Sequence, residues 1–328
     1  MLVMDPPVSD LIGERVARSC AEAGVDPLVL MAAGEVTYAA VEQLSLACSG
    51  HQPTVVVGLG GGKVLDSAKA VSVRLGLPVI TVPTIASNDS PTSSAIAMYD
   101  DNHHLVAVDM MDANPLAVLV DTELIAAAPS HFLRSGIGDA IAKVYEADGC
   151  AGGTGVTPLG TRPLAIAGAI ARACHDTLRA DGVQALADCE AKSVSPAVER
   201  VVEAAVLMSG LAFENGGLSL AHSLTRGLMR VEGARDLLHG YHVAWGALVQ
   251  LEAEGRPADE VADLASFLRS AGLPVSSADL RLPRPWNEQH VAIARHTMSA
   301  PHLANLRVQV DEPAIVGAIE RVDRLAGL

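Results

Sequence analysis

Three side chains in this sequence, Asp139, His222 and His239, have the chemistry of metal ligands. Asp139 lies near the start of GIGDAIAKV, His222 within GGLSLAHSLTRG, and His239 near the start of LLHGYHVAWGALVQL. One carboxylate and two imidazoles would hold zinc or ferrous iron and leave a position open for a substrate oxygen. Their spacing fits no local metal-binding motif. In addition, a histidine in an apolar helix is more often a core residue than a ligand, and Asp139 could be a helix cap. The residues by themselves leave both interpretations open.

A glycine-rich turn, Gly58-Leu-Gly-Gly-Gly-Lys63, follows a strongly apolar run. Backbone N–H groups at the start of a helix bind anions, and glycines let a phosphate approach closely. The pattern is not GxGxxG, because position 63 is lysine, and it is not a P-loop, because Val64 follows that lysine. The turn therefore favours a pyrophosphate site over a tight turn without a ligand. Asp5, at the end of the first apolar run, is compatible with a ribose contact or with a helix cap.

A second polar loop, residues 83–93, comes directly after the apolar run 77–83. Ligands of open α/β sheets bind beyond the carboxyl ends of the strands. The loop offers hydroxyl, amide and carboxylate groups that suit a ribose or a polyhydroxylated ligand: Thr84, Ser87, Asn88, Asp89, Thr92 and Ser93. An ordinary solvated loop would have a similar composition, so the residues leave that alternative open.

The elements that must position these groups change in kind along the chain. Continuous apolar runs predict strands at 2–4, 27–32, 54–62, 77–83 and 116–121, and helical patterns fill 9–24 and 37–48. Non-alternating runs separated by helices are typical of a parallel sheet buried on both faces. Residues 94–109 differ, since two short runs around an Asp-Asp-Asn turn predict a β-hairpin.

Beyond about residue 122 only helical patterns follow. They cover 136–149, 159–180, 183–191, 195–215, 218–229, 242–255, 259–272, 288–299 and 312–327. We therefore expect an α/β domain with a mainly parallel sheet over residues 1–128 and an all-helical domain over 129–328. Apart from His222, His239 and His242, the histidines have charged or turn neighbours and are expected at the surface: His51, His103, His104, His131, His175, His290, His296 and His302.

Composition excludes several classes of protein. The chain has 328 residues, with 23 Lys+Arg against 38 Asp+Glu and a net charge of −15, which argues against a nucleic-acid partner. The longest apolar runs are far shorter than the ~20 residues of a membrane-spanning helix, and the first ten residues lack the pattern of a secretory signal. Five scattered cysteines predict small buried side chains in a reducing compartment, so we expect a cytoplasmic protein that contacts no membrane.

Six segments together resemble successive blocks of the glycerol dehydrogenases, within the metal-dependent (iron-containing) alcohol dehydrogenase superfamily. They are GLGGGKVLDSAKA, VPTIASNDSPTSSA, VDTELIAAAP, GIGDAIAKVYEA, SGLAFENGGLSLAHSL and LHGYHVAWGALVQL, and they occur in the order typical of that family. The resemblance extends from Asp5 to about residue 310. It implies a dinucleotide-binding α/β domain followed by a helical domain. It also implies that the substrates are small polyols and their ketones, interconverted with NAD.

The resemblance also implies roles for single residues. Asp139, His222 and His239 match the metal ligands, for zinc or alternatively iron, and Asp89 matches the aspartate on the substrate side. Gly60, Gly61 and Gly62 would hold the NAD pyrophosphate and Asp5 the adenosine ribose, while Thr84 and Ser87 would lie near the nicotinamide. The remaining residues expected at the cofactor are Lys63, Asp66 and Ser93. The resemblance also implies that the chain forms a homo-oligomer.

Departures from the family pattern leave other functions open. Thr225 and Arg226 stand where glycerol dehydrogenases commonly have His and Asn, and Arg226 could pair with a carboxylate or phosphate of the substrate. The chain also begins at the first strand, which leaves the oligomeric state open. The alternatives are an acidic, phosphorylated or cyclitol substrate, a lyase similar to dehydroquinate synthase, and an inactive NAD-binding member. His242 is either a proton relay or a surface residue.

Overall fold

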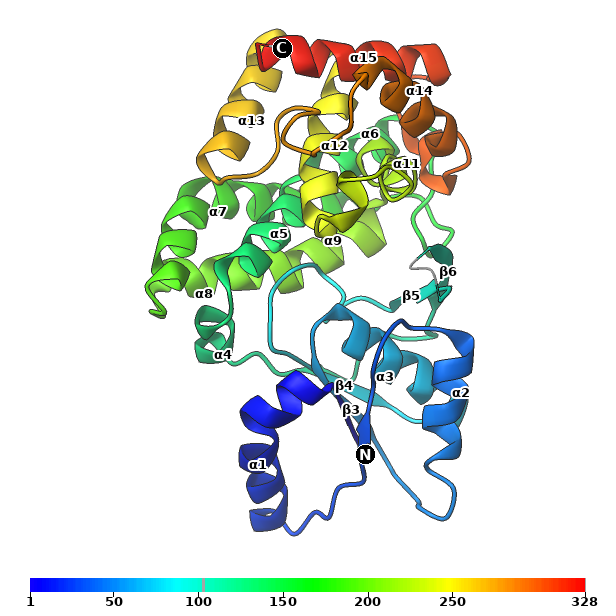
Figure 1. The fold of residues 1–328 in the computed structure, drawn as a ribbon, viewed down its shortest axis with the longest axis vertical. Coiled ribbons are helices and arrows are strands. Elements are labelled where there is room, and N and C mark those ends of the chain that lie inside the picture. The colour runs from blue at the N-terminus through cyan, green and yellow to red at the C-terminus, as the bar shows by residue number, and fades with distance from the viewer. Residues whose placement is uncertain (102–103, 328) are drawn as a thin grey trace. The chain divides into compact units, whose positions relative to one another are not determined.

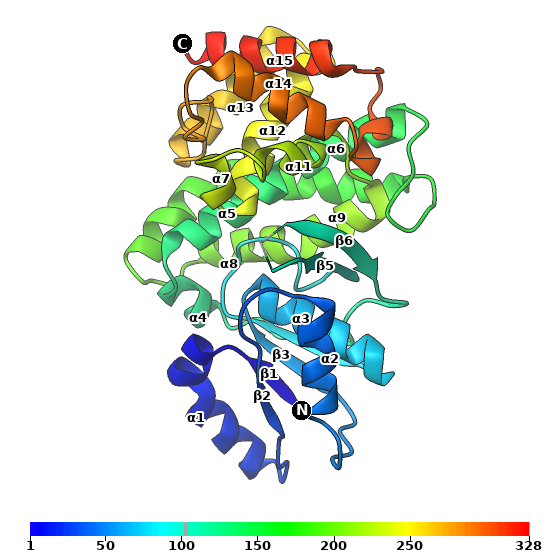
Figure 2. The same cartoon turned by 45° about the vertical axis from the view of Figure 1, so that its right-hand side comes forward.

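A computed structural model describes residues 1–101 and 104–327. Contacts within the chain divide it into two units, one of residues 1–86 and 90–128 and one of residues 87–89 and 129–328. Figures 1 and 2 show the strands in the first unit and the helices of the second. Each unit is described here by itself.

The first unit is a parallel sheet with helices on both faces. Its five strands have the order β2-β1-β3-β4-β7, and β5 pairs antiparallel with β6 as a separate hairpin. The elements are β1 (Leu2–Met4), α1 (Pro6–Glu22), β2 (Val29–Met31), α2 (Tyr38–Leu46), β3 (Val56–Gly60), α3 (Gly62–Leu75), β4 (Val79–Pro83), β5 (Ala95–Tyr99), β6 (Leu105–Met110), β7 (Ala117–Val118) and α4 (Thr122–Ala127). The predicted sheet and hairpin are thus confirmed.

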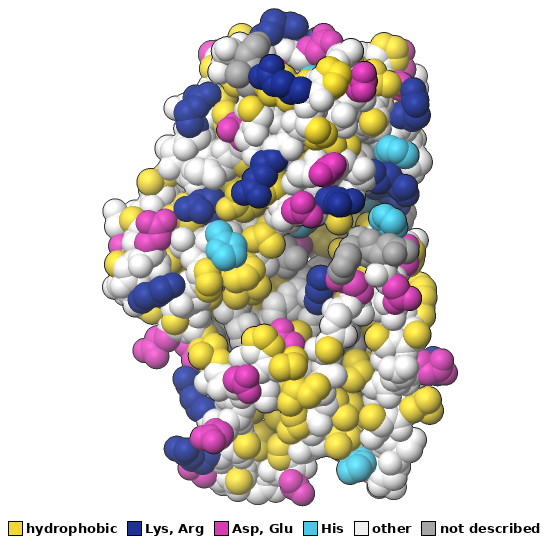
Figure 3. All heavy atoms as spheres, in the orientation of Figure 1, with side chains coloured by type: hydrophobic (Ala, Val, Ile, Leu, Met, Phe, Trp, Pro, Cys, Tyr) yellow, Lys and Arg dark blue, Asp and Glu magenta, His cyan; other side chains and the backbone are white. Residues whose placement is uncertain are grey.

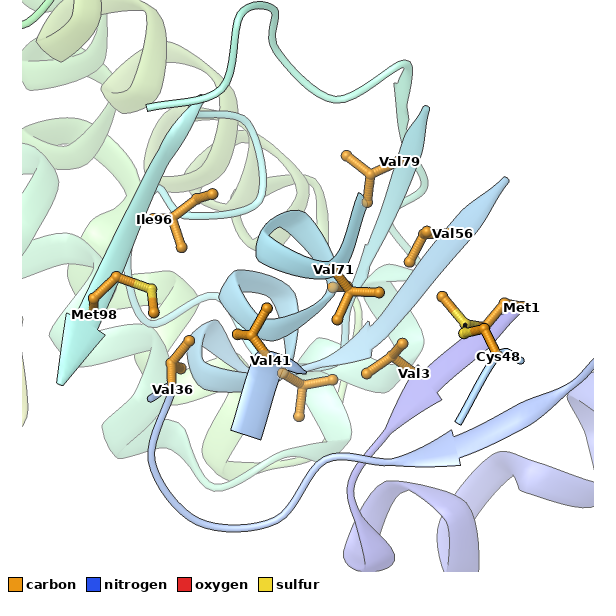
Figure 4. Packing of buried hydrophobic residues seen from close by; sticks show 12 residues of the cluster. Met1, Val3, Val36, Val41, Cys48, Val56, Val71, Val79, Ile96 and Met98 are labelled. Carbon is orange, nitrogen blue, oxygen red and sulfur yellow. Dashed lines mark hydrogen bonds between the residues drawn. The ribbon is translucent and has the colours of Figure 1, made fainter. Parts of the chain in front are cut away.

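The side chains of successive β1 residues point to opposite faces of the sheet, because side chains alternate along a strand. Val3 packs with residues of α2 and α3, a cluster drawn in Figure 4, whereas Leu2 and Met4 pack with Val8 and Ile12 of α1. Burial on both faces explains why the strands are continuously apolar. Helix α1 begins at Pro6 instead of the predicted residue 9, because Asp5 accepts a hydrogen bond from the Val8 amide and caps it.

The second unit consists of helices and loops, and the described residues after 121 include no strand. Its elements are α5 (Ser130–Ile141), α6 (Lys143–Gly152), α7 (Ala165–Glu190), α8 (Pro196–Glu203), the π-helix η1 (Ala204–Met208), α9 (Ser209–Gly216), α10 (Leu220–Ser223), α11 (Thr225–Leu228), η2 (Ala234–Asp236), α12 (His239–Ala253), α13 (Ala258–Ser270), α14 (Trp286–Thr297), η3 (Pro301–Asn305) and α15 (Glu312–Leu325). The predicted fold class, an α/β region followed by helices, is confirmed.

Helix α12 forms the centre of the second unit. It contacts α5, α6, α10, α11, α13 and α15, and Figure 1 shows it crossing the interior of the helical region. Nearly all its residues from Gly240 to Leu251 are buried, which a helix surrounded by others requires. Several helix predictions were wrong in their limits. The predicted helix 136–149 is divided between α5 and α6 at Ala142, 195–215 is divided among α8, η1 and α9, and 218–229 between α10 and α11. The separate predictions 159–180 and 183–191 are the single helix α7.

No helix in the described part of the chain combines the length and apolar character that crossing a membrane requires. All five cysteines are free. Cys48, Cys150, Cys174 and Cys189 are buried as predicted, whereas Cys20 is only partly buried.

Candidate functional site

The candidate metal ligands come together in the second unit from three helices. Asp139 lies on α5, His222 on α10 and His239 at the start of α12, and one donor atom from each lies within 4.8 Å of the others. The Oδ1 atom of Asp139 is 3.2 Å from Nε2 of His222 and 3.8 Å from Nε2 of His239. Asp139 is buried, while the side chain of His239 is 42% exposed, so the cluster opens to solvent on the His239 side.

Glycines allow these helices to approach closely. A Cβ atom at Gly240 would lie 1.7 Å from the carbonyl oxygen of Ser135, and one at Gly138 would lie 2.4 Å from the carbonyl oxygen of Gly240. Backbone contact between α5 and α12 therefore places His239, the neighbour of Gly240, beside Asp139, the neighbour of Gly138. A Cβ atom at Gly246 would likewise lie 2.6 Å from the carbonyl oxygen of Ala221, next to His222.

His222 is fixed by a carboxylate that the sequence analysis did not single out. The Nδ1 atom of His222 is 2.6 Å from Oε2 of Glu146, and Oε1 of Glu146 accepts hydrogen bonds from the amides of Ser219 and His222. Burial acts to lower the pKa of His222, but the charge of Glu146 and the hydrogen bonds to Asp139 and Glu146 together raise the pKa to about 9. This contact turns Nε2 of His222 toward Asp139, as carboxylates do for metal-binding histidines.

The donor set fits a divalent metal ion. A carboxylate and two imidazoles are the ligands of many zinc and iron centres, and Glu146 supplies the outer carboxylate that such histidines usually have. The second oxygen of Asp139, Oδ2, is buried and has no hydrogen-bond partner among the described residues. A buried carboxylate oxygen without a partner is costly, so an additional cation would stabilise it.

Asp89 and Lys143 complete the cluster. The ammonium of Lys143 is 2.8 Å from Oδ1 of Asp139 and 3.1 Å from Oδ2 of Asp89, and Ser209 donates a hydrogen bond of 2.9 Å to the same Asp89 oxygen. Burial and the negative charge of Asp139 raise the pKa of Asp89. Burial also acts to raise the pKa of Asp139, but Lys143 and the two histidines hold it far below its usual range. Two neighbouring carboxyl groups with opposite shifts are typical of sites that handle protons.

The sequence contained a signal for the two groups that were missed. Lys143 and Glu146 follow Asp139 by four and seven residues within an apolar segment, so the three share one helical face. Charged residues on the buried face of an apolar helix indicate an internal polar cluster. The sequence analysis therefore named fewer residues of this cluster than the structure brings together.

Three histidines for which the sequence analysis gave a surface position, for His242 as one of two alternatives, are less exposed than expected: His242 and His290 are buried, and His302 is half-buried. His242 is buried on α12, 2.8 Å from the carbonyl oxygen of Ala234, and burial lowers its pKa. His290 is buried against Ser277 and Asp323. Burial lowers the pKa of His302 to about 4, with additional repulsion from His222 and Arg226. His302 therefore lies within electrostatic reach of the cluster. His103 lies outside the described residues.

The carboxyl edge of the parallel sheet brings together the expected cofactor residues of the first unit. Met4 pairs with Leu59, and Gly60 pairs with Pro83, so Asp5, Gly61 and Thr84 follow neighbouring strands at one edge. Helix α3 starts directly after Gly61, and its first amides have no acceptors within the helix. A Cβ atom at Gly60 would lie 2.7 Å from Cβ of Val64, which shows that close packing of α3 also requires glycine.

The other expected cofactor residues have protein partners. Asp5 caps α1, and Lys63 forms an ion pair with Glu35. Asp66 is buried and binds Lys69 and Ser90.

Ser93 is buried, and the carbonyl of Ser87 accepts a hydrogen bond from Ser135 within the second unit. The structure therefore places Ser87 and Asp89 with the helical unit, and the other expected cofactor residues with the sheet.

Comparisons with known proteins identify the family of this chain. A family model described as iron-containing alcohol dehydrogenase matches residues 1–129. A glycerol dehydrogenase of Thermotoga maritima is 39% identical over 285 residues, covering 87% of this chain and 78% of that protein. A glycolaldehyde reductase of Halobacterium salinarum is 38% identical over the same shares of the two chains.

The crystal structure of glycerol dehydrogenase from Schizosaccharomyces pombe superposes with a TM-score of 0.94 at 32% identity, covering 99% of this chain and 83% of that one. Relatives above 30% identity that span most of both chains establish the family. This chain is an oxidoreductase that belongs to the iron-containing alcohol dehydrogenase family.

Proposed function

We propose that this chain is an NAD-linked, metal-dependent dehydrogenase that interconverts a small, glycerol-like polyol and its ketone. The observation that carries the proposal is the convergence of Asp139, His222 and His239 within 4.8 Å, beside Asp89, whose side chain is 14% exposed. The relatives support the substrate class, because one is named a glycerol dehydrogenase and another a glycolaldehyde reductase. Both names describe enzymes of small hydroxylated molecules.

Asp139, His222 and His239 would hold the metal, with zinc the first expectation and iron the alternative. A metal at this place supplies Lewis acidity, which lowers the pKa of a substrate hydroxyl. Glu146 keeps Nε2 of His222 directed at the cluster through its 2.6 Å contact with Nδ1. Asp89, held by Lys143 and Ser209, would accept a hydrogen bond from a second substrate hydroxyl and so orient the carbinol carbon.

The sheet edge of the first unit would bind NAD. The amides at the start of α3, over Gly60, Gly61 and Gly62, would receive the pyrophosphate, with Lys63 as a neighbouring cation. Asp5 would bind the adenosine ribose and would repel a 2′-phosphate, which favours NAD over NADP.

Thr84, Ser87 and Ser93 would lie near the nicotinamide half of NAD. Asp66 would not contact NAD directly, because its oxygens already bind Lys69 and Ser90.

A hydroxy acid is a second candidate substrate, and a specific observation favours it. Arg226 is exposed, lies within electrostatic reach of His302, and makes no side-chain hydrogen bond or ion pair among the residues that the structure describes. In a chain with a net charge of −15, an arginine without a carboxylate partner is available for an anionic group. A substrate carboxylate would use it through paired hydrogen bonds.

The assembly and location are proposed on more general grounds. Strand β2 is at the edge of the sheet, and its Val29 and Met31 are exposed. Figure 3 shows hydrophobic side chains gathered over the part of the surface that the first unit forms. An apolar, unpaired edge favours contact with another chain, here a second copy of this one. Five free cysteines agree with a reducing, cytoplasmic compartment.

The test is NADH formation with glycerol, diols, cyclitols and hydroxy acids. Each substrate is measured before chelation, after chelation, and after zinc or ferrous iron is restored. We expect turnover of a small polyol that chelation abolishes and metal restores. Preference for a hydroxy acid, lost in the Arg226→Gln variant, would replace glycerol-like substrates by the second candidate. Turnover that is insensitive to chelation would refute the metal assignment.

A further inference from the structure

Lys143 occupies an unusual place in the cluster. Its side chain is 1% exposed, and it is the first residue of α6, one turn after Asp139. Its ammonium lies 2.8 Å from Oδ1 of Asp139 and 3.2 Å from Nε2 of His222. These two atoms belong to the set of three that could ligate a metal ion. A third contact, of 3.1 Å, joins the ammonium to Asp89.

The ammonium and a metal ion compete for the same electrons. An imidazole nitrogen that carries no proton has a single lone pair, so Nε2 of His222 cannot accept a hydrogen bond from Lys143 and also bind a metal. The carboxylate Oδ1 has more capacity, but an ammonium and a divalent ion on one oxygen repel each other in a buried site. The three contacts of Lys143 as they stand are therefore incompatible with a metal on all three ligands.

The surroundings show where the ammonium can go. Asp89 accepts from both Lys143 and Ser209, and the ring of Phe213 lies 5.7 Å from the Lys143 nitrogen. A lysine side chain has four rotatable carbon bonds and three donors, so it can leave one partner and keep another. Asp89 can retain the ammonium when His222 and Asp139 turn to the metal.

We propose that Lys143 is a resident cation that competes with the metal: it holds the ligands together in the metal-free chain and withdraws toward Asp89 when the metal binds. The proposal rests on the proposed metal site. It makes Lys143 a positioning residue that sets metal affinity, and it predicts that the metal-free chain stays folded, because the buried carboxylates keep a counter-ion. Metal binding and the position of Asp89, the substrate-side aspartate, are then coupled.

The test is the affinity for Zn²⁺, measured by competition with a chromophoric chelator. It compares the unmodified chain with Lys143→Met, which keeps the length of the side chain and removes its charge. Lys192→Met is the matched control, because Lys192 is exposed after the end of α7. We expect Lys143→Met to bind Zn²⁺ at least tenfold more tightly and Lys192→Met to bind it unchanged. Equal or weaker binding by Lys143→Met would overturn the proposal.

A variant of Asp139 separates this inference from the proposed function. Asp139→Asn removes a ligand and keeps Lys143, so it should lose Zn²⁺ binding if the metal site is assigned correctly. Binding retained in Asp139→Asn, or absent from both the unmodified chain and Lys143→Met, would refute the metal site itself. Tight Zn²⁺ binding that is lost in Asp139→Asn but unchanged in Lys143→Met would refute the competition between Lys143 and the metal, and would leave the metal site standing.

A measurement on the unmodified chain covers the case in which Lys143→Met does not fold. In a crystal structure with Zn²⁺ bound, the ammonium of Lys143 should lie beyond hydrogen-bond distance of Nε2 of His222 and should keep its contact with Asp89. An ammonium that stays at 3.2 Å from that nitrogen while Asp139, His222 and His239 all bind the metal would contradict the proposal.

Discussion

Lys69 in the sheet unit and Lys143 in the helical unit are both completely buried lysines, but their partners differ. The ammonium of Lys69 has one carboxylate, one hydroxyl and one carbonyl oxygen around it, from Asp66, Ser90 and Ala95. Three donors meet three acceptors, and one positive charge meets one negative charge. Lys143 instead lies among the carboxylates of Asp89 and Asp139 and near that of Glu146.

The difference separates an ion pair whose groups are fully satisfied from one that we propose to be functional. Lys69 and Asp66 tie α3 to β5 and to the loop before it, and their hydrogen bonds satisfy both groups. Around Lys143 the negative charges outnumber the lysine, and Oδ2 of Asp139 is left without a partner among the described residues. A buried carboxylate oxygen without a protein partner is costly, which supports the proposal that a metal ion or substrate binds here.

Replacing Asp139 by Asn should have the largest effect. It removes a ligand charge from the cluster without changing the shape of the side chain. Lewis acidity is worth several kcal/mol, so we expect a loss of at least about 1,000-fold in kcat/KM. NAD binding, measured by fluorescence titration, should stay within about twofold of the unmodified chain, because the expected NAD residues other than Ser87 are in the sheet unit. Normal turnover would show that Asp139 ligates nothing.

Replacing each of the two lysines by Met should lower the melting temperature, and Zn²⁺ should act differently on the two variants. Lys69→Met leaves Asp66 as a buried, unpaired charge, which costs about 3–5 kcal/mol and lowers the melting temperature by roughly 10 °C. Zn²⁺ should not restore the melting temperature of Lys69→Met. Lys143→Met should also melt earlier without metal, but Zn²⁺ should restore most of the loss. Calorimetry with and without Zn²⁺ measures both, and equal responses of the two variants would remove the distinction.

Replacing Glu146 by Gln should have an intermediate effect. The amide can accept the backbone hydrogen bonds of Ser219 and His222, but it no longer carries the charge that faces Nδ1 of His222. Loss of an outer carboxylate typically costs about 10- to 100-fold in metal affinity or activity. Zn²⁺ competition and steady-state kinetics should both show this loss. A change in melting temperature without either effect would make Glu146 purely structural.

Replacing Ser209 by Ala should affect KM by about threefold to tenfold, with kcat nearly unchanged. The variant loses one hydrogen bond to Asp89, worth about 1 kcal/mol, while the contact with Lys143 remains. The readout is KM for a substrate with two hydroxyls compared with that for a simple alcohol. An equal change for both substrates would place Asp89 away from the second hydroxyl.

The pair of His290 and Asp323 gives a structural reference for His222 and Glu146. Burial would raise the pKa of Asp323, but hydrogen bonds from His290 and Ser277 lower it below its ordinary value of 3.8. A lowered pKa in the folded state stabilises the fold above pH 3.8, and this stability is lost as pH falls further.

Asp323→Asn should therefore cost about 1 kcal/mol at pH 7. The difference from the unmodified chain should shrink below about pH 4, followed by denaturant unfolding. A difference that is independent of pH would mean that the carboxylate charge contributes nothing.

The sheet unit was the more predictable half of the chain. Continuous apolar runs between helices specify a buried parallel sheet, and each strand from Leu2–Met4 to Val79–Pro83 formed within a predicted run. Helix limits were less predictable, because caps decide them: Asp5 starts α1 earlier than the apolar pattern does. In the helical unit the apolar pattern is equally consistent with one long helix or two, and packing divided 136–149 at Ala142.

By itself the sequence determined the fold class, the family, and the identity of the residue types that could bind a metal, because these depend on local patterns and on blocks of consecutive residues. Only the tertiary structure decided that Lys143, Glu146 and Ser209 join Asp89, Asp139 and His222 in one buried cluster. Close backbone contacts at Gly138, Gly240 and Gly246 bring the helices together. The balance of charge around a buried lysine is a property of several distant segments at once, and no single segment of the sequence contains it.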